Sequence, residues 1–280
     1  MAQRIADPAL ARRVMVHEAR AQQSVGRELR ELGDGWLLHD PADAEPFWNR
    51  LVAPQWPEAR PAFDRRLDEV VTLFSTLDRL PHIRPLPAGS QPPDLAHRLL
   101  EFGFEAVGAD RRMVLADRTP CLALAERWEH GPHDGITIER YPDPLPPARR
   151  AWALDAAVVL AEAFGVDPFR RLALETDVLA CVARRGCSIL LVRDSGEPIA
   201  VARRATIDGA SYLSSIGTRP AWRGRGHGKV ATALAVADAI EAGSDLVHLA
   251  VDVGNDAAVR FYEALGFVLV GDAVPDLLLR

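Results

Sequence analysis

One stretch decides the fold of this chain: Ile216-Gly217-Thr218-Arg219-Pro220-Ala221-Trp222-Arg223-Gly224-Arg225-Gly226-His227-Gly228-Lys229. The apolar run Ala210 to Ile216 leads into it and predicts a strand, and Val230 to Ala242, rich in Ala and Leu, predicts a helix after it. Three glycines occupy every second position between them. Because the first amides of a helix have no partner within it and the helix dipole favours negative charge there, this arrangement predicts an anion site.

The charges of the turn limit the class of ligand that can bind there. Arg223, Arg225 and Lys229 add positive charge, so we expect a phosphate or pyrophosphate. A P-loop is excluded because no Lys-Ser/Thr pair closes the turn to hold magnesium. The dinucleotide fingerprint fits only in its looser form, begun at Gly226, and too few residues follow Asp252 to complete a doubly wound sheet.

A second motif follows at a fixed order. Asp245 to Asp252 predicts a buried strand, and Asn255, Phe261-Tyr262-Glu263 and Leu265-Gly266-Phe267 come after it. The order of strand, Arg-x-x-Gly-x-Gly, helix, strand, Asn-x-x-Ala, Phe-Tyr-Glu and Leu-Gly-Phe resembles the GNAT superfamily of acyl-CoA-dependent N-acyltransferases. The resemblance covers roughly residues 135 to 280.

The resemblance implies that acetyl-CoA is the acyl donor. Its pyrophosphate would lie on the amides of the Gly-rich turn, and the strand before the turn would offer backbone groups to the pantetheine arm and the thioester carbonyl. The motif's arginine is Arg223 or Arg219, depending on the alignment. Asn255 matches an asparagine that contacts CoA, although a helix N-cap requires the same residue type. The expected CoA-binding residues are Ile216, Gly217, Thr218, Arg223, Gly224, Arg225, Gly226, His227, Gly228, Lys229 and Asn255.

The resemblance also implies catalytic roles. Tyr262 matches the tyrosine proposed as the general acid for the departing thiolate, and the competing interpretation is a core aromatic beside Phe261. The glutamate that some relatives use as a general base is missing, since Ala250 stands near that position. Strand alternation places His248 and Asp252 on the same face as Ala250, so both are candidates, and a histidine has the better intrinsic pKa. For each of the two, a residue without a catalytic role is the competing interpretation.

The first half of the chain contains a degenerate copy of the second motif. Set without gaps, Gly103-Phe104 falls on Gly266-Phe267, and Leu99 falls on Tyr262. No Gly-rich turn precedes the helix expected from Phe63. We therefore expect an α+β protein of two GNAT-like domains in tandem, each a mixed, mostly antiparallel central sheet flanked by helices; a chance recurrence of Gly-Phe is the alternative. The degenerate first domain would span residues 1–117, and it should neither bind CoA in the family's manner nor transfer an acyl group. A linker would follow over residues 118–134, and the catalytic domain would span residues 135–280.

Periodicity and turn residues predict further elements outside the two motifs. Helices are expected over residues 9–32, 63–80, 93–102, 122–129, 146–164 and 172–185. Strands are expected over 35–40, 81–86, 104–115, 135–140, 187–193, 198–205 and 268–279. Prolines within 81–86 favour an edge or end strand there.

Composition excludes several classes of protein. No apolar run approaches the ~18 residues that span a membrane, and the polar N-terminus lacks the core of a signal peptide. The net charge of -6 argues against nucleic-acid and anionic-membrane partners. Cys121, Cys181 and Cys187 have no zinc spacing, so we expect reduced thiols in a cytoplasm and no metal. Lys229 is the single lysine, which suggests a GC-rich bacterial source.

These observations predict a cytoplasmic acetyl-CoA-dependent N-acetyltransferase. It would acetylate a primary amine of a small molecule by direct attack in a ternary complex, since no cysteine lies in the motif region to form an acyl-enzyme. A protein or peptide N-acetyltransferase is the first alternative, and a non-catalytic CoA-binding regulator is the second. The sequence leaves the acceptor, the acyl length and the choice between monomer and homodimer open.

Overall fold

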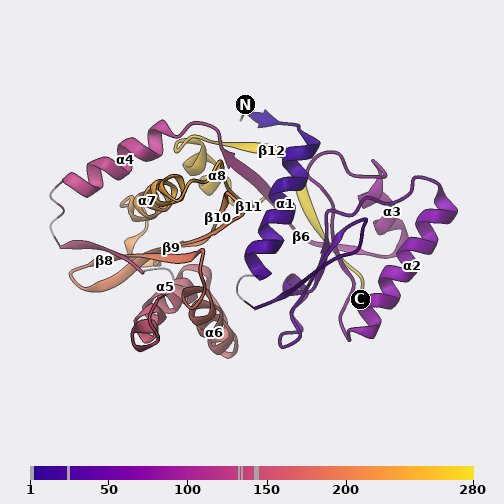
Figure 1. The fold of residues 1–280 in the computed structure, drawn as a ribbon, viewed down its shortest axis with the longest axis horizontal. Helices are drawn as coiled ribbons and strands as arrows, with labels where there is room; N and C mark the ends of the chain where they lie inside the picture. Colours follow the sequence, from indigo (N-terminus) through magenta and orange to yellow (C-terminus); the bar gives the residue numbers. More distant parts are fainter. Residues whose placement is uncertain (1–2, 24–25, 132, 134, 142–144) are drawn as a thin grey trace. The chain divides into compact units, whose positions relative to one another are not determined.

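A computed structural model describes residues 3–23, 26–131, 133, 135–141 and 145–280, and Figure 1 shows its fold. Residues 132 and 134 of the expected linker lie outside the described residues. Contacts divide the chain into two units. The first unit comprises Met1–Met113, Ala250–Asp256 and Val268–Arg280, and the second comprises Val114–Leu249 and Ala257–Phe267. Residues 268–280, which the sequence places in the second domain, thus belong to the first unit.

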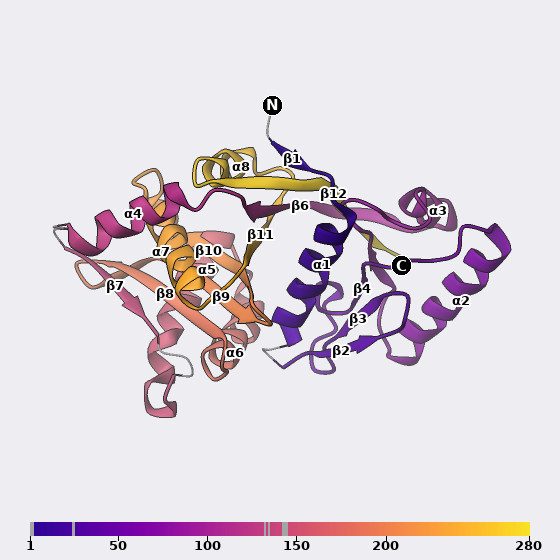
Figure 2. The ribbon, with the colours of Figure 1, turned by 45° about the horizontal axis from the view of Figure 1, so that its top comes forward.

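The first unit is a mixed sheet with helices on both faces (Figure 2). The strands follow the order β2-β3-β4-β5-β12-β6, and β1 pairs in parallel with β12. The strands are β1 (Arg4–Ile5), β2 (Glu28–Glu31), β3 (Trp36–His39), β4 (Arg50–Val52), β5 (His82–Arg84), β6 (Glu105–Leu115) and β12 (Phe267–Leu278). The helices are α1 (Pro8–Gln23), α2 (Arg60–Thr76) and α3 (Leu95–Phe102), with a short 3-10 helix at Pro46–Trp48. One core cluster joins Phe63 and Phe74 of α2 and Leu99 of α3 to the sheet, and another joins Met15 of α1.

Two expectations for the first unit were wrong. The helix expected over 9–32 ends at Gln23, and Glu28–Glu31 forms β2, because its alternation of charged residues with one leucine suits a strand on β3. The strand at residues 81–86 is interior, since β5 pairs with β4 on one side and with β12 on the other. Pro81 and Pro85 flank β5 without interrupting it, so their missing amides do not break the ladder.

A buried group of charges lies at the centre of the first unit. Three guanidinium groups and three carboxylates take part: Arg50, Arg84, Arg112, Glu18, Asp110 and Asp276. The three arginines are fully buried, and Glu18 contacts all of them. The three positive and three negative charges balance, which is the condition under which buried charges are tolerated.

The second unit is a five-stranded sheet in the order β11-β10-β9-β8-β7. Its pairs are antiparallel except for β10 with β11, which is parallel. The strands are β7 (Ile136–Arg140), β8 (Cys187–Asp194), β9 (Glu197–Ile207), β10 (Ala210–Thr218) and β11 (Leu246–Asp252). The helices are α4 (Thr119–His130), α5 (Leu154–Phe164), α6 (Arg171–Val182), α7 (His227–Glu241) and α8 (Asp256–Glu263). Short 3-10 helices span Pro147–Ala153, Pro168–Arg170 and Pro220–Trp222.

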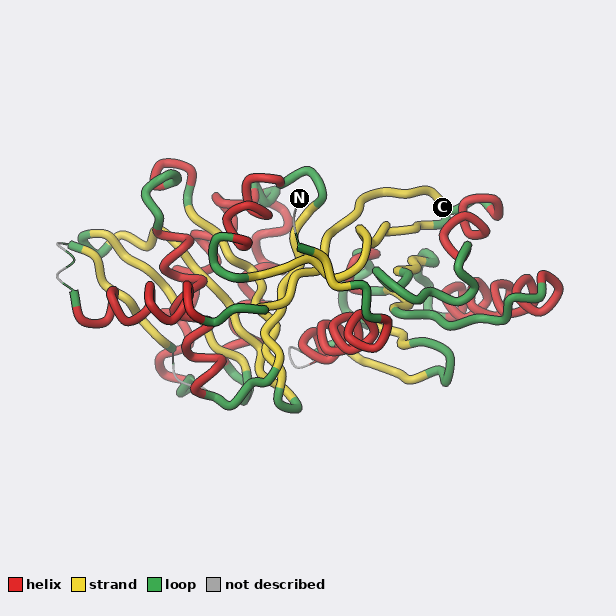
Figure 3. The backbone as a smooth tube through the Cα atoms, turned by 90° about the horizontal axis from the view of Figure 1, so that it is seen from above, coloured by secondary structure: helices red, strands yellow, loops and turns green. Residues whose placement is uncertain are grey.

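Helices cover both faces of this second sheet. Figure 1 shows α7 and α5 on opposite sides of β9, and Figure 3 shows strands lying side by side. α4 forms within the segment expected to be a linker and packs on α7. Buried alanines along α7, among them Ala231, Ala235 and Ala239, let this helix approach the sheet closely.

The repeat predicted from the sequence has a structural counterpart. Gly103 ends α3 and Gly266 follows α8, and both have a positive φ, of 117° and 92°. Each glycine amide donates back into the preceding helix, to Leu100 and Glu263 respectively. A long strand follows each glycine, β6 in one case and β12 in the other. The two copies therefore share a helix, a left-handed glycine and a strand.

Candidate active site

The Gly-rich turn leads into α7 as the sequence predicted. Gly224 and Gly226 have φ values of 79° and 86°, in the left-handed region that favours glycine. Gly226 is the N-cap of α7, and its carbonyl accepts the first helical hydrogen bond, from the amide of Val230. A Cβ added at Gly224 or Gly226 would meet no atom within 4 Å. The space before the helix N-terminus is therefore open, and the amides of the first turn face no partner within the helix.

The end of β10 lies against this turn. The parallel pairing of β10 with β11 runs to Leu213 opposite Leu249, whereas β10 continues to Thr218. A register shift between Ser214 and Gly217 interrupts the pairing with β9. A Cβ on Gly228 would come within 3.0 Å of the Thr218 hydroxyl oxygen, so the turn and the strand are in close contact. Ile216, Gly217 and Thr218 thus lie on a strand segment whose described pairing to β11 has ended.

Gly217 is required by a close approach of α5. A Cβ at Gly217 would lie 2.9 Å from Ala163 Cβ, 3.4 Å from Phe164 Cε2 and 3.7 Å from Leu160 Cδ2. Carbon atoms in ordinary contact are 3.5–4.0 Å apart, so only glycine fits here without a shift. The last turn of α5 therefore packs directly on the strand segment that the sequence assigns to the thioester.

The arginines of the stretch divide into two kinds. Arg219 donates to both carboxylate oxygens of Glu162, at 2.8 and 2.9 Å, and to Glu197 at 2.5 Å. These hydrogen bonds, that to Glu162 first, raise the pKa of Arg219, and the two carboxylates compensate its charge. Arg223 donates instead to the carbonyls of Thr218, at 3.2 Å, and Ala163, at 2.6 Å. Because carbonyls do not cancel its charge, Arg223 rather than Arg219 keeps a positive field beside the turn.

The remaining basic residues of the turn differ in burial. Arg225 is exposed and Lys229 is half-buried. His227, the first residue of α7, is buried, and its Nδ1 has no hydrogen-bond partner among the described residues. Burial lowers the pKa of His227, so the imidazole is neutral at pH 7. His227 therefore brings a neutral ring, and no charge, to the anion site.

Tyr262 projects from α8 in an aromatic cluster. Its ring meets Phe261 and Phe267 edge to face, with ring centroids 4.8 and 5.9 Å away. Burial raises the pKa of Tyr262 above its usual value. The phenol is thus fully protonated at neutral pH. A protonated hydroxyl is the form that a general acid requires.

The two base candidates have different surroundings. His248 is 0% exposed and stacks on Tyr212 of β10, with ring centroids 5.1 Å apart. Asp252 is exposed, and its Oδ1 accepts the amide of Gly254 at 2.7 Å. Asn255 precedes α8, whose first residue is Asp256. Asp252 and Asn255 belong to the first unit by contacts, so their roles in the site, like that of His248, stay predictions.

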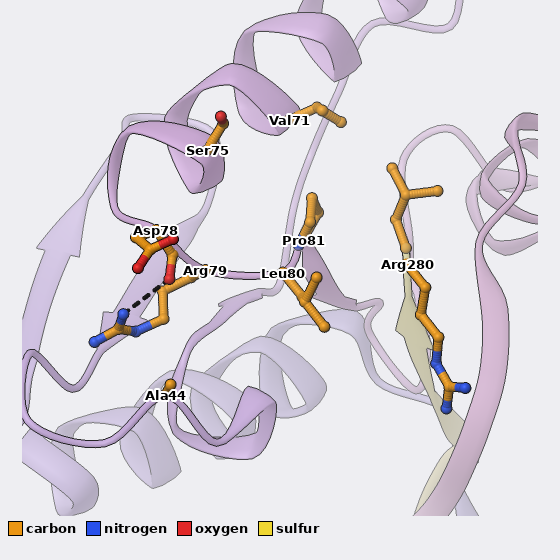
Figure 4. Close-up of a pocket in the computed structure, with 9 residues that line it drawn as sticks. Ala44, Val71, Ser75, Asp78, Arg79, Leu80, Pro81 and Arg280 are labelled. Atoms are coloured by element: carbon orange, nitrogen blue, oxygen red, sulfur yellow. Dashed lines mark hydrogen bonds between the residues drawn. The ribbon is translucent and has the colours of Figure 1, made fainter.

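Two cavities lie apart from these residues. One, of about 590 Å³ in the first unit, is lined by Val71, Ser75, the Asp78–Pro81 turn and Arg280, among others (Figure 4). Arg79 holds this turn by donating to the carbonyls of Asp78, Asp40 and Pro41. A second, of about 350 Å³ in the second unit, includes Arg140, Arg204 and Asp238. None of the predicted site residues lines either cavity.

The described part of the chain lacks two other kinds of feature, a metal site and a membrane-spanning helix. It holds no group of three or more His, Cys, Asp or Glu side chains placed to bind a metal ion. None of its helices combines the length and the apolar character needed to cross a bilayer. Cys121, Cys181 and Cys187 are buried.

Comparison with known families matches residues 151–267 to the model of the acetyltransferase (GNAT) family. Residues 151–267 form a GNAT domain. This segment contains α5 to α8, the Gly-rich turn and Tyr262, which are the elements on which the predicted site depends.

Known proteins resemble the chain at two levels. A mycothiol acetyltransferase from Nocardiopsis dassonvillei is 44% identical over 54 residues, which span 19% of this chain and 16% of that relative. A GCN5-related N-acetyltransferase from Kribbella flavida has a TM-score of 0.66 at 24% identity and covers 95% of each chain. A tandem GNAT protein from the clavulanic acid biosynthesis pathway has a TM-score of 0.59 at 15% identity, over 90% of this chain and 82% of that one. The fold is therefore that of tandem GNAT proteins over most of the chain.

Sequence reasoning missed part of the site. Glu162, Ala163 and Phe164 at the end of α5 contact Gly217, Arg219 and Arg223, more than fifty residues later. No motif marks them, because a clamp between a helix end and a distant loop leaves no periodic pattern in the sequence.

Proposed function

We propose that this protein is an acetyl-CoA-dependent N-acetyltransferase that acts on a primary amine of a small molecule. The observation that carries the proposal is the open N-terminus of α7, which lies next to the segment of β10 beyond its pairing with β11. Amides at a helix N-terminus hold a pyrophosphate, and the backbone of an unpaired strand edge holds an amide-rich arm such as pantetheine. GNAT membership of residues 151–267 supports the same donor.

The chemistry follows from groups on the chain. The neutral amine attacks the thioester carbonyl, whose oxygen is polarised by a backbone amide near Gly217 and Thr218. The tetrahedral intermediate collapses, the C–S bond breaks, and Tyr262 donates its proton to the departing thiolate. The proton that the amine loses passes to His248 or Asp252, directly or through water. Since His248 has no exposed surface, it requires a water relay, whereas Asp252 is open to solvent.

The first unit would have no acyl-transfer role of its own. At the start of α2 the chain reads Ala59-Arg60-Pro61, with a proline in the first turn in place of a Gly-rich turn. Leu99, at the position that matches Tyr262, is buried in the core. We infer that this unit supports the fold or the acceptor side of the enzyme, in a cytoplasmic bacterial protein that works as a monomer or homodimer.

Thiol release from acetyl-CoA with a panel of amines tests the proposal. Polyamines, aminoglycosides, amino acid amides and short peptides form the panel. We expect release with one class, and Tyr262→Phe should lower kcat about 10²-fold while the Kd of CoA stays unchanged. Tyr141→Phe is the matched control, because Tyr141 is also a buried tyrosine of the second unit with a raised pKa.

The outcomes separate the alternatives. Turnover of peptides only would favour the protein N-acetyltransferase. Tight CoA binding without turnover on any amine would refute the enzyme and favour a CoA-binding regulator. No CoA binding would refute the whole proposal.

A further inference from the structure

The last turn of α5 is fixed to the CoA-binding stretch by side chains and backbone together. Arg219 holds the carboxylate of Glu162 with two hydrogen bonds, and Arg223 donates to the carbonyl of Ala163 at 2.6 Å. Gly165, with a φ of 61°, ends the helix directly after Phe164. Three consecutive residues, Glu162 to Phe164, are thus held against Gly217 and its neighbours.

Phe164 is exposed in spite of this fixed position. Its Cε2 lies 3.4 Å from the place where a Cβ of Gly217 would be, yet 58% of the residue remains exposed. An exposed aromatic ring gains free energy when a partner covers it, since apolar surface leaves water. A residue whose backbone is already fixed at the end of a helix loses little further backbone entropy on binding, so Phe164 suits a ligand contact.

The position of the Phe164 ring indicates which part of the acceptor it would contact. The proposed function places the thioester carbonyl beside Gly217 and Thr218, and an attacking nitrogen must come within about 3–3.5 Å of the carbonyl carbon. The atoms bonded to that nitrogen must then pass close to Phe164. The charges of Glu162 and Arg219 compensate each other, and the guanidinium group of Arg223 is directed to the backbone carbonyls of Thr218 and Ala163.

We propose that Phe164 binds the apolar group next to the reacting nitrogen, so that the acceptor is an amine carrying an aliphatic or aromatic substituent within a few bonds. This inference rests on the proposed function and narrows its substrate class. Amines that are polar throughout, such as polyamines and aminoglycosides, leave the ring uncovered and are poor acceptors. Phe164 acts as a specificity residue and takes no part in proton transfer.

Two neighbouring residues provide a control. Phe169 and Leu172 are even more exposed, at 80% and 73%, and lie on the segment that joins α5 to α6 and on α6 itself. Neither is among the atoms nearest to Gly217. Removing the Phe169 ring therefore removes at least as much exposed aromatic area as removing the Phe164 ring, while it leaves the contact with β10 intact.

The experiment compares two acceptors that differ only in their side chain, phenylalaninamide and glycinamide. We expect wild-type kcat/KM to favour phenylalaninamide by at least ~10-fold, in line with the discrimination that apolar pockets achieve. Phe164→Ala should remove most of this preference through KM, Phe164→Leu should restore part of it, and Phe169→Ala should leave it unchanged. The Kd of CoA should be the same in all four proteins.

The results distinguish this inference from the proposed function. An unchanged preference in Phe164→Ala, or an equal loss in Phe169→Ala, overturns the inference while the enzyme stands. If wild-type protein releases no thiol with either amide, the proposed function fails for these acceptors. Calorimetry of both amides with CoA-loaded protein then tests whether Phe164 binds the apolar side chain. Stronger binding of phenylalaninamide that is lost in Phe164→Ala supports the inference, and equal binding of the two amides overturns it.

Discussion

Replacing Gly217 with alanine should disturb the contact between β10 and α5. The new Cβ would lie 2.9 Å from Ala163 Cβ, well inside the 3.5–4.0 Å of an ordinary carbon contact. Overpacking of this kind costs about 1–3 kcal/mol, and the lower entropy of an unfolded alanine chain offsets about 0.4–1 kcal/mol. We therefore expect Gly217→Ala to lower the free energy of unfolding of the second unit by about 1–2 kcal/mol. At roughly 2–4 °C per kcal/mol, the Tm falls by about 2–8 °C.

A double-mutant cycle tests the cause. Ala163→Gly removes the opposing methyl group and alone costs about 1 kcal/mol as a glycine within a helix. Combined with Gly217→Ala it should relieve the closest contact, although Phe164 Cε2 at 3.4 Å still presses on the new methyl group. We expect a favourable coupling of about 0.5–1.5 kcal/mol, measured by urea denaturation with circular dichroism.

A glycine with enough space for a Cβ provides the control for Gly217→Ala. Gly108 of β6 would place its Cβ 3.5 Å from Asp276 Oδ2, an ordinary contact, so Gly108→Ala should not destabilise the first unit by overpacking. Additive effects of Gly217→Ala and Ala163→Gly within about 0.3 kcal/mol would refute the steric reasoning.

Three further predictions concern charges. Glu18→Gln should destabilise the first unit by about 3–5 kcal/mol in urea, because buried arginines lose a charged partner, whereas the control Glu28→Gln, at an exposed ion pair with Arg30, should leave the urea midpoint nearly unchanged. Burial alone would raise the pKa of Asp276, but the hydrogen bond from His82 and the nearby guanidinium groups hold this pKa at about 2. The free energy of unfolding that the ionised carboxylate contributes is therefore fully present above pH ~4 and should be lost as the pH drops through 2. An acid titration of Asp276→Asn should lack this loss. Burial lowers the pKa of His227, so stability present above its ordinary pKa of ~6.5 should decline at lower pH; His227→Leu should show a flatter unfolding free energy between pH 5 and 7.

Local signals predicted the Gly-rich turn well. Gly224 and Gly226 need their left-handed backbone for reasons contained within a few residues, and the start of α7 follows from the same turn. The two glycines at 103 and 266 likewise end helices in the same way in both halves, so a weak repeat in sequence matched a real one in structure.

Long-range pairing was less predictable. The prolines at residues 81–86 predicted an edge or end strand. β5 nevertheless pairs with β4 on one side and, on the other, with β12 from the far end of the chain. The compensation of Arg219 by Glu162 and the burial of His248 beneath Tyr212 depend in the same way on distant partners. Such facts become visible only when the chain is folded, because the residues involved are individually ordinary.

The strand β12 has a consequence for biosynthesis. Its residues 268–278 pair with β5 and complete the first unit, although the rest of that unit is mostly made before residue 114. During translation the early segment must therefore wait, with the edge of β5 unpaired, until the entire second unit has left the ribosome. A nonsense codon shortly after Phe267 would leave the GNAT motif complete and disable the half of the protein that was synthesised first.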